Sequence, residues 1–270
     1  MSELNGKSVL ITGGSRGLGK ALALKLAAPW TRHLPVATLR RQLRQGLGLL
    51  EAERSPDERP EHATLRATFN RSWQFLDAGQ RQVLAALSIC NAPPQLDDAV
   101  VVAAARPAQL QALAAQSLLD IDASGRVSLH PLVRAFAAEQ LDAAATHAVR
   151  DRHAQHWADR LRPYKVFIGS NSSAALALLA AELPQLLQAW QHALDPLRPD
   201  WLADLAPPLS NHFQAAGGIV TAIDLFQRAH QALQAVRPPA PDAQWRVGLE
   251  LASLLYWLSD YPRVEQLARA

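Results

Sequence analysis

A glycine-rich loop near the N-terminus is the first feature of this 270-residue chain that could do chemistry. A short apolar run rich in β-branched residues, residues 8–12, leads into the loop, and a run of alanines and leucines follows it. This order predicts a strand, a tight loop and the start of a helix. Glycines suit such a loop, because the backbone must turn tightly and bring its N–H groups close to a pyrophosphate. The candidate cofactor-binding residues are Thr12, Gly13, Gly17 and Gly19.

The first 27 residues closely resemble the opening of short-chain dehydrogenases/reductases, whose Thr-Gly-x-x-x-Gly-x-Gly pattern those four residues match. The resemblance implies NAD or NADP as the cofactor. The rest of the family's pattern is missing, because the chain has no Asn-Asn-Ala-Gly segment and no tyrosine followed four residues later by lysine. A lone strand also lacks the neighbours that a parallel sheet needs. We therefore expect no cofactor and no catalysis, with an NAD(P)-dependent dehydrogenase/reductase as the alternative function.

A second candidate residue, His130, stands between a predicted hairpin and a predicted helix. Residues 119–122 and 126–130 flank an Ala-Ser-Gly sequence, which is a signal for a β-hairpin. A helix with proline in its first turn is predicted at residues 131–141. Upstream, the pattern predicts four further helices, at residues 62–76, 78–89, 94–105 and 107–118. Asp77 is expected to cap the second of them. Helices followed by one hairpin and a further helix describe a winged-helix domain.

Three stretches of this region are similar to the winged-helix region of bacterial signal-transduction ATPases of the NB-ARC type; they are Leu65–Trp73, Leu110–Leu119 and Val127–Arg134. In that family the region follows a nucleotide-binding core and precedes helical repeats. The family carries Met-His-Asp where this chain has Leu-His-Pro, so the resemblance makes His130 the counterpart of the histidine that reaches the phosphates of ADP. The chain has no Gly-x-x-x-x-Gly-Lys-Ser/Thr loop to hold a nucleotide. The alternative interpretation of His130 is a histidine at a strand end, hydrogen-bonded to the backbone.

The C-terminal part of the chain has tetratricopeptide-like spacing. After one predicted turn, apolar and small residues lie at offsets 0, 3, 7 and 10: Ile219, Ala222, Phe226 and Ala229. After a second turn, residues of the same kind lie at offsets 0, 3 and 7: Tyr261, Val264 and Ala268. We expect an array of helical repeats that binds a protein partner. Because the chain stops at Ala270, inside the second helix of a repeat, we expect this array to be truncated.

Two helices carry residues whose burial the pattern predicts. Trp73 lies on the apolar face of the helix at residues 62–76, and we expect it to be a core anchor. The predicted helix at residues 245–259 is apolar around most of its circumference. Because we expect little to cover its outer side, Leu254 and Trp257 should remain partly exposed. Such a patch favours self-association or the capture of a partner helix.

Composition excludes several classes of function. With 49% apolar and 19% charged residues the chain is globular, and it has no run of about 18 apolar residues that could span a membrane. A single cysteine, Cys90, excludes a disulfide framework and a multi-cysteine zinc site. His153 and His156 share a helix face, but without a third ligand we expect that face to be solvated rather than to bind a metal. No leader of the secretory type opens the chain, and we expect a cytoplasmic protein.

Charge argues against direct binding to DNA. Residues 1–28 carry a net charge of +3 and three of the four lysines, so the remainder of the chain is neutral. The predicted recognition helix carries no cation over residues 107–116, whereas DNA-binding helices need them. The change in lysine usage also suggests that the chain combines two pieces of different ancestry.

We therefore expect a mainly α fold, with a winged-helix domain that has one β-hairpin, then tetratricopeptide-like helical repeats, and a short N-terminal strand–loop–helix leader. Four segments are expected: the dehydrogenase-like leader at residues 1–28, a helix and linker at 29–61, the winged-helix-like domain at 62–142 and the helical repeats at 143–270. The expected function is a non-catalytic regulatory and protein-interaction fragment of a signal-transduction ATPase-like regulator.

Overall fold

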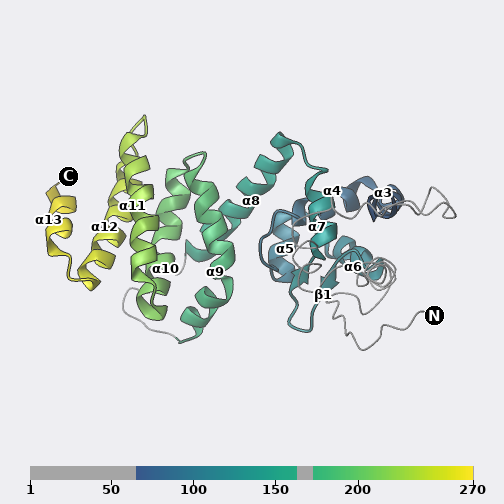
Figure 1. Ribbon diagram of the computed structural model, residues 1–270, viewed down its shortest axis with the longest axis horizontal. Helices are drawn as coiled ribbons and strands as arrows, with labels where there is room; N and C mark the ends of the chain where they lie inside the picture. Colours follow the sequence, from purple (N-terminus) through teal and green to yellow (C-terminus); the bar gives the residue numbers. More distant parts are fainter. Residues whose placement is uncertain (1–64, 163–172, 270) are drawn as a thin grey trace, which may run out of the picture. The chain divides into compact units, whose positions relative to one another are not determined.

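A computed structural model describes residues 65–162 and 173–269 of the chain (Figure 1). These residues divide into two compact units, one ending at Thr146 and the other beginning at His147. The fold of the described residues is mainly helical, with one two-stranded antiparallel sheet. The expected fold class, in which helices and one hairpin precede helical repeats, is confirmed at this level. The finer division into four segments stays a prediction.

The first unit consists of short helices and the hairpin. Its elements are α3 (Leu65–Phe75), α4 (Ala78–Leu87), α5 (Leu96–Val102), α6 (Pro107–Ala115), β1 (Asp120–Ile121), β2 (Val127–Ser128) and α7 (Pro131–Ala138). As predicted, Asp77 caps α4: its carboxylate accepts a hydrogen bond from the Gln80 backbone N–H, and the Gln80 side chain accepts one from the Asp77 N–H. The hairpin pairs Asp120 with Ser128 and turns at Gly125, whose φ of 81° favours glycine.

Aromatic rings join α3 to α7 in the core of the first unit. Phe69 is buried and stacks on Phe136 with ring centroids 5.8 Å apart, and Trp73 meets Phe136 edge-on at 5.6 Å. Trp73, which the sequence predicts to be a core anchor, is only half-buried, although its ring contacts the buried Phe136. The reason is that α3 packs against α7, and Trp73 lies at the margin of this contact. Phe136, which is buried, anchors the cluster instead.

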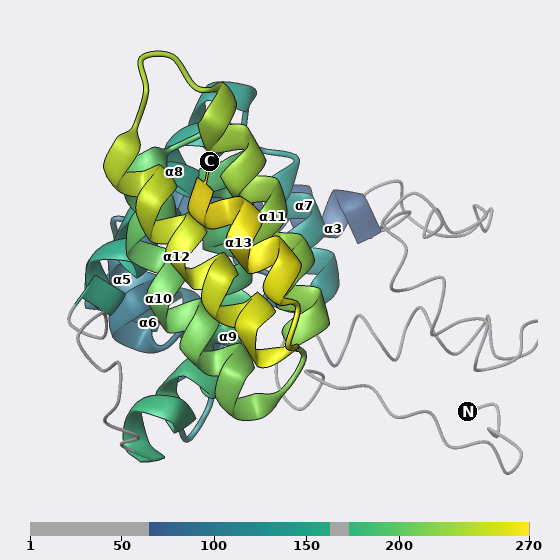
Figure 2. The ribbon, with the colours of Figure 1, turned by 90° about the vertical axis from the view of Figure 1, so that its left-hand side faces the viewer.

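The second unit is a row of longer helices. After α8 (Ala143–Leu161), most of which belongs to this unit, come α9 (Ser173–Leu194), α10 (Pro199–Ala216), α11 (Ile219–Ala235), α12 (Pro241–Trp257) and α13 (Tyr261–Arg269). Helix α9 packs on α10, α10 and α11 both pack on α12, and α12 packs on α13. Figure 2 looks at this row from the α13 side and shows α11, α12 and α13 lying side by side.

The last four helices form two copies of one helix pair. Helices α10 and α11 begin at positions 199 and 219, and α12 and α13 begin at positions 241 and 261, so the two helices of each pair start at the same spacing. Both first helices open with Pro-Asp, which suits the first turn because proline there loses no helical hydrogen bond. Gly217 and Gly218 have φ near 90° and turn the chain from α10 into α11. The helix-pair repeat expected from the sequence is therefore present.

A continuous core runs through the second unit. The largest fully buried side chains include Trp157 of α8, Trp190 of α9 and Phe226 of α11, and the rings of Trp190 and Phe226 lie 4.8 Å apart. Leu254 of α12 is 0% exposed, which contradicts the expectation that it would be partly exposed. The reason is geometric, because Leu254 shares a helix face with Val247 and Leu251, and that face packs into the core.

Candidate functional site

The predicted cofactor loop cannot be placed in this fold. Thr12, Gly13, Gly17 and Gly19 lie outside the described residues. Their role in binding NAD or NADP therefore stays a sequence-based prediction.

His130 is the N-cap of helix α7. Its Nδ1 atom accepts a hydrogen bond of 3.3 Å from the backbone N–H of Leu132, and Pro131 occupies the first helical position. Partial burial lowers the pKa of His130, which keeps the imidazole neutral and Nδ1 available as an acceptor. This geometry matches the interpretation of His130 as a backbone-bonded residue at a strand end. A nucleotide-sensing role for His130 stays a prediction from the family resemblance.

Two histidines of the second unit form polar links between α8 and α9. His153 is buried, with Nε2 2.7 Å from Oε1 of Gln185, so the expected solvated face is wrong for this residue. The cause is α9, which covers that side of α8. His192 is also buried, and its Nε2 lies 2.7 Å from Oδ1 of Asp151, whose Oδ2 accepts a 3.1 Å bond from Arg198. These partners are 32 to 47 residues apart in the sequence, so helical periodicity cannot predict them.

Neither a metal site nor a reactive thiol emerges from the described residues. No cluster of three or more His, Cys, Asp or Glu side chains among them could hold a metal ion. Burial raises the pKa of Cys90 to about 12, so its thiol stays protonated at neutral pH and is a poor nucleophile.

A polar network ties α10 to α12 across the repeat. The Gln214 side chain donates hydrogen bonds to Ser210 Oγ at 2.8 Å and to Ser253 Oγ at 3.3 Å, and its Oε1 accepts one of 2.8 Å from Trp257 Nε1. Ser210 also hydrogen-bonds the buried carboxylate of Glu250. This network fixes the position of α12 relative to α10, and with it the direction in which the outer face of α12 points.

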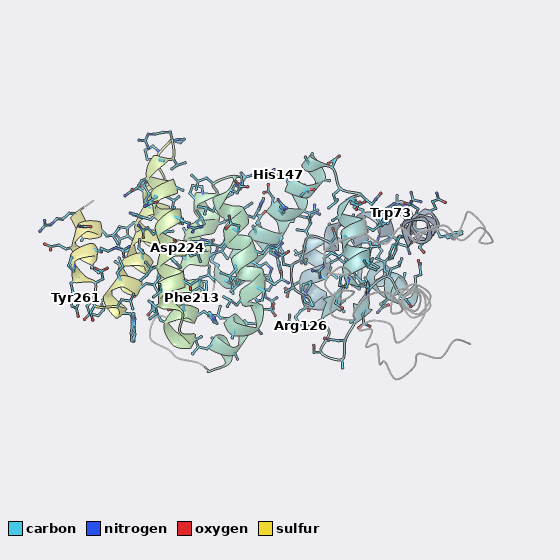
Figure 3. All side chains as sticks on the ribbon, viewed as in Figure 1. Trp73, Arg126, His147, Phe213, Asp224 and Tyr261 are labelled. Atoms are coloured by element: carbon cyan, nitrogen blue, oxygen red, sulfur yellow. The ribbon has the colours of Figure 1, made fainter. Side chains whose placement is uncertain are left out.

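The outer face of α12 carries exposed apolar side chains. Four positions at the spacing of one helix face form a stripe, which we call the α12 outer stripe: Trp245, Leu249, Ala252 and Tyr256. Trp245, Leu249 and Tyr256 are 68%, 47% and 62% exposed, and Ala252 is half-buried. The ring of Tyr256 lies edge-on to that of Tyr261 at 5.7 Å, and Figure 3 marks Tyr261 at the first turn of α13. Trp257 is 60% exposed, as expected from the sequence.

Of the two residues of this helix that the sequence predicts to be exposed, Trp257 is exposed and Leu254 is buried. The α12 outer stripe has the periodicity of one helix face, and the core positions Val247, Leu251 and Leu254 have the same periodicity on the opposite face. Both faces are apolar, so hydrophobicity alone does not distinguish the inner face from the outer one. The packing of α10 and α11 against one face of α12 decides which face is buried.

Comparisons with known proteins give one weak structural likeness. No protein-family model matches the sequence, and no curated protein matches it. A similar solved structure is that of a signal transduction ATPase with numerous domains, with a tetratricopeptide repeat sensor, from Pyrococcus horikoshii. The identity is 16% and the TM-score is 0.38; the match covers 94% of this chain and 40% of that protein. The chain thus spans about two fifths of the length of that ATPase. No helix in the described part of the chain is long and apolar enough to span a membrane.

Proposed function

We propose that this chain is a non-catalytic regulatory fragment, of the kind found in signal-transduction ATPase-like regulators, and that it binds a protein partner through its helical repeats. The observation that carries the proposal is the α12 outer stripe, which presents exposed aromatic and aliphatic side chains on a helix held rigidly by its neighbours.

The physical support comes from the kind of surface that α12 offers. Trp and Tyr are enriched in protein interfaces because they bury a large area at a low cost in conformational entropy. Covering one large apolar side chain contributes roughly 1.5–3 kcal/mol. The network around Gln214 holds α12 in place before any partner arrives, so little ordering entropy opposes binding.

In this proposal the first unit is a winged-helix spacer. Its order of helices, hairpin and final helix is that of the sequence-based prediction. Helix α6, which corresponds to the predicted recognition helix, carries no lysine or arginine, and this supports a role other than reading DNA. The oxidoreductase alternative rests on the N-terminal motif alone.

A peptide selection tests the proposed function. The full chain would be panned against a displayed library of helical and extended peptides, with counter-selection on a Trp245→Ser/Tyr256→Ser double variant. Both residues are exposed, so the double variant should keep its fold, which circular dichroism would confirm. We expect the selection to enrich peptides that bind the original chain and do not bind the double variant. If the peptides bind the double variant as well as the original chain, or if none is enriched, the proposed function is wrong.

A further inference from the structure

The α12 outer stripe has a counterpart on α10, the first helix of the preceding pair. Aligning the first residue of α12 with the first residue of α10 places the four stripe residues on buried or half-buried positions: Ala203, Pro207, Ser210 and Gln214. Two of these positions, Ser210 and Gln214, hydrogen-bond residues of α12. The face that is open on α12 is therefore, on α10, part of an interface with the first helix of the following pair.

The interface between α10 and α12 is parallel. Ser210 hydrogen-bonds Glu250, and Gln214, one turn further along α10, hydrogen-bonds Ser253 and Trp257 further along α12. The contacts thus advance in the same direction on both helices. Helix α11 also packs on α12, so α12 lies against both helices of the pair before it. The pair α12–α13 ends this row of helices, and in the described part of the chain no further pair follows it (Figure 1).

We propose that the α12 outer stripe receives an amphipathic helix of a partner protein, which runs parallel to α12 and takes the position that α12 takes on α10. This inference rests on the proposed function, because it names the class of partner for the same surface. Helical repeats pack each unit on its neighbours, so the partner helix extends an interface that the fold already contains. A second folded copy cannot supply the matching face of α12, since Val247 and Leu254 on that face are buried in the core.

The sizes of the stripe residues specify the contact face of the partner helix. Trp245 is larger than Ala203, its counterpart on α10, and Tyr256 is larger than Gln214. Dense packing therefore requires small residues opposite these two rings. Ala252 is the small residue of the stripe, and it leaves room for a large side chain on the partner.

The side chain opposite Ala252 must also be uncharged. On α10 the corresponding residue is Ser210, which hydrogen-bonds the buried carboxylate of Glu250. Ala252 has no hydroxyl, so a carboxylate opposite it would be buried without that hydrogen bond, at a cost in free energy. The partner helix is therefore one with a large apolar residue, such as leucine, at this position.

The direction of the partner helix fixes where that leucine stands in its sequence. The stripe residues are spaced at i, i+4, i+7 and i+11, and the contact residues of a parallel helix follow the same order. A parallel helix then carries its leucine at i+7, opposite Ala252, with small residues at i, i+4 and i+11. In an antiparallel helix the order reverses, and the leucine stands at i+4.

Two synthetic peptides of identical composition test the proposal. Both have glutamate and lysine on the outer face and alanine at three of the four contact positions; the parallel probe has leucine at i+7 and the control peptide has it at i+4. In fluorescence anisotropy we expect the full chain to bind the parallel probe at least tenfold more tightly than the control peptide. Trp245→Ser should weaken this binding, and Val220→Ser on the exposed part of α11 should leave it unchanged. Equal or tighter binding of the control peptide, or no binding of either, would overturn the proposal.

Disulfide trapping measures the direction independently. Asp242 and Ser259 are exposed and flank the two ends of the stripe, and the buried Cys90 leaves the unmodified chain as the background. A parallel probe with an N-terminal cysteine should cross-link faster to Asp242→Cys than to Ser259→Cys, because a disulfide forms only over a short Cα separation. Faster trapping by Ser259→Cys, or equal rates, would contradict the parallel direction.

The parallel helix and the proposed function fail in distinguishable ways. If the peptide selection yields stripe-dependent peptides that are extended, or helices that bind antiparallel, the parallel helix is wrong and the proposed function stands. Sedimentation that shows a dimer weakened by Leu249→Asp would identify a second copy as the occupant and overturn the partner protein. If the selection yields no peptide and neither probe binds, both are wrong.

Discussion

At the scale of single residues, His130 shows how a motif position can have a structural role. Its Nδ1 atom caps α7 by accepting the Leu132 N–H, and this requires a neutral ring. Burial lowers its pKa and favours that neutral form. The sequence predicts both a nucleotide-sensing counterpart and a backbone-bonded histidine, because the same strand–proline–helix context serves either role.

Replacing His130 should separate the capping role from other roles. We expect His130→Ala to lower the free energy of unfolding by about 0.5–2 kcal/mol, and His130→Asn to restore most of the loss, because Asn is a good N-cap. The folded pKa is lower than the unfolded one, so the stability that His130 contributes is present above pH ~6.5 and is lost as pH falls below it. His130→Asn should reduce this acid sensitivity in urea titrations. Equal stability of all three proteins at neutral pH would contradict the capping role.

Glu250 should have the opposite pH dependence. Burial raises its pKa, and the hydrogen bond from Ser210 offsets this only in part. Because the folded pKa exceeds the unfolded one, the stability contribution of Glu250 is complete below pH ~4.5 and is lost as pH rises through the folded value. Glu250→Gln should therefore be more stable than the original chain at pH 8, with a smaller difference at pH 4. An unchanged urea midpoint at pH 8 would contradict this account, and Glu265→Gln on the exposed face of α13 is the control.

At the scale of elements, the sequence predicts the order and kind of the helices better than their surroundings. Turn residues and caps such as Asp77 act locally, so the hairpin and the starts of α4 and α7 follow from short stretches. The half-buried position of Trp73 and the full burial of Leu254 depend on which helix covers which face. That is decided by partners far away in the sequence, and an apolar pattern alone does not identify them. The link between His192 and Asp151 is hidden for the same reason.

The aromatic cluster of the first unit gives a prediction at this scale. We expect Phe136→Ala to cost about 3–5 kcal/mol, since Phe136 is buried and contacts both Phe69 and Trp73. Trp73→Ala should cost less, because part of that ring is already in water. Chemical denaturation of the two variants measures both losses. A greater loss for Trp73→Ala would place the anchor of the cluster at Trp73 after all.

At the scale of the whole molecule, the alternative oxidoreductase function makes a separate prediction. The sequence offers no further strands to form a sheet around the glycine loop and no acidic ribose ligand after it, so we expect no saturable fluorescence change on titration with NADH or NADPH. Micromolar binding that is lost in Gly17→Val would contradict this expectation and restore the alternative.

The central claim is that the α12 outer stripe is the surface through which this chain binds other proteins. Fluorescence anisotropy with a labelled peptide from the selection tests it most directly, on the original chain, on Trp245→Ser/Tyr256→Ser and on the off-stripe control Val220→Ser. The account predicts a Kd for the double variant at least tenfold weaker, which corresponds to about 1.4 kcal/mol, and an unchanged Kd for the control. Equal affinity for all three proteins would contradict it.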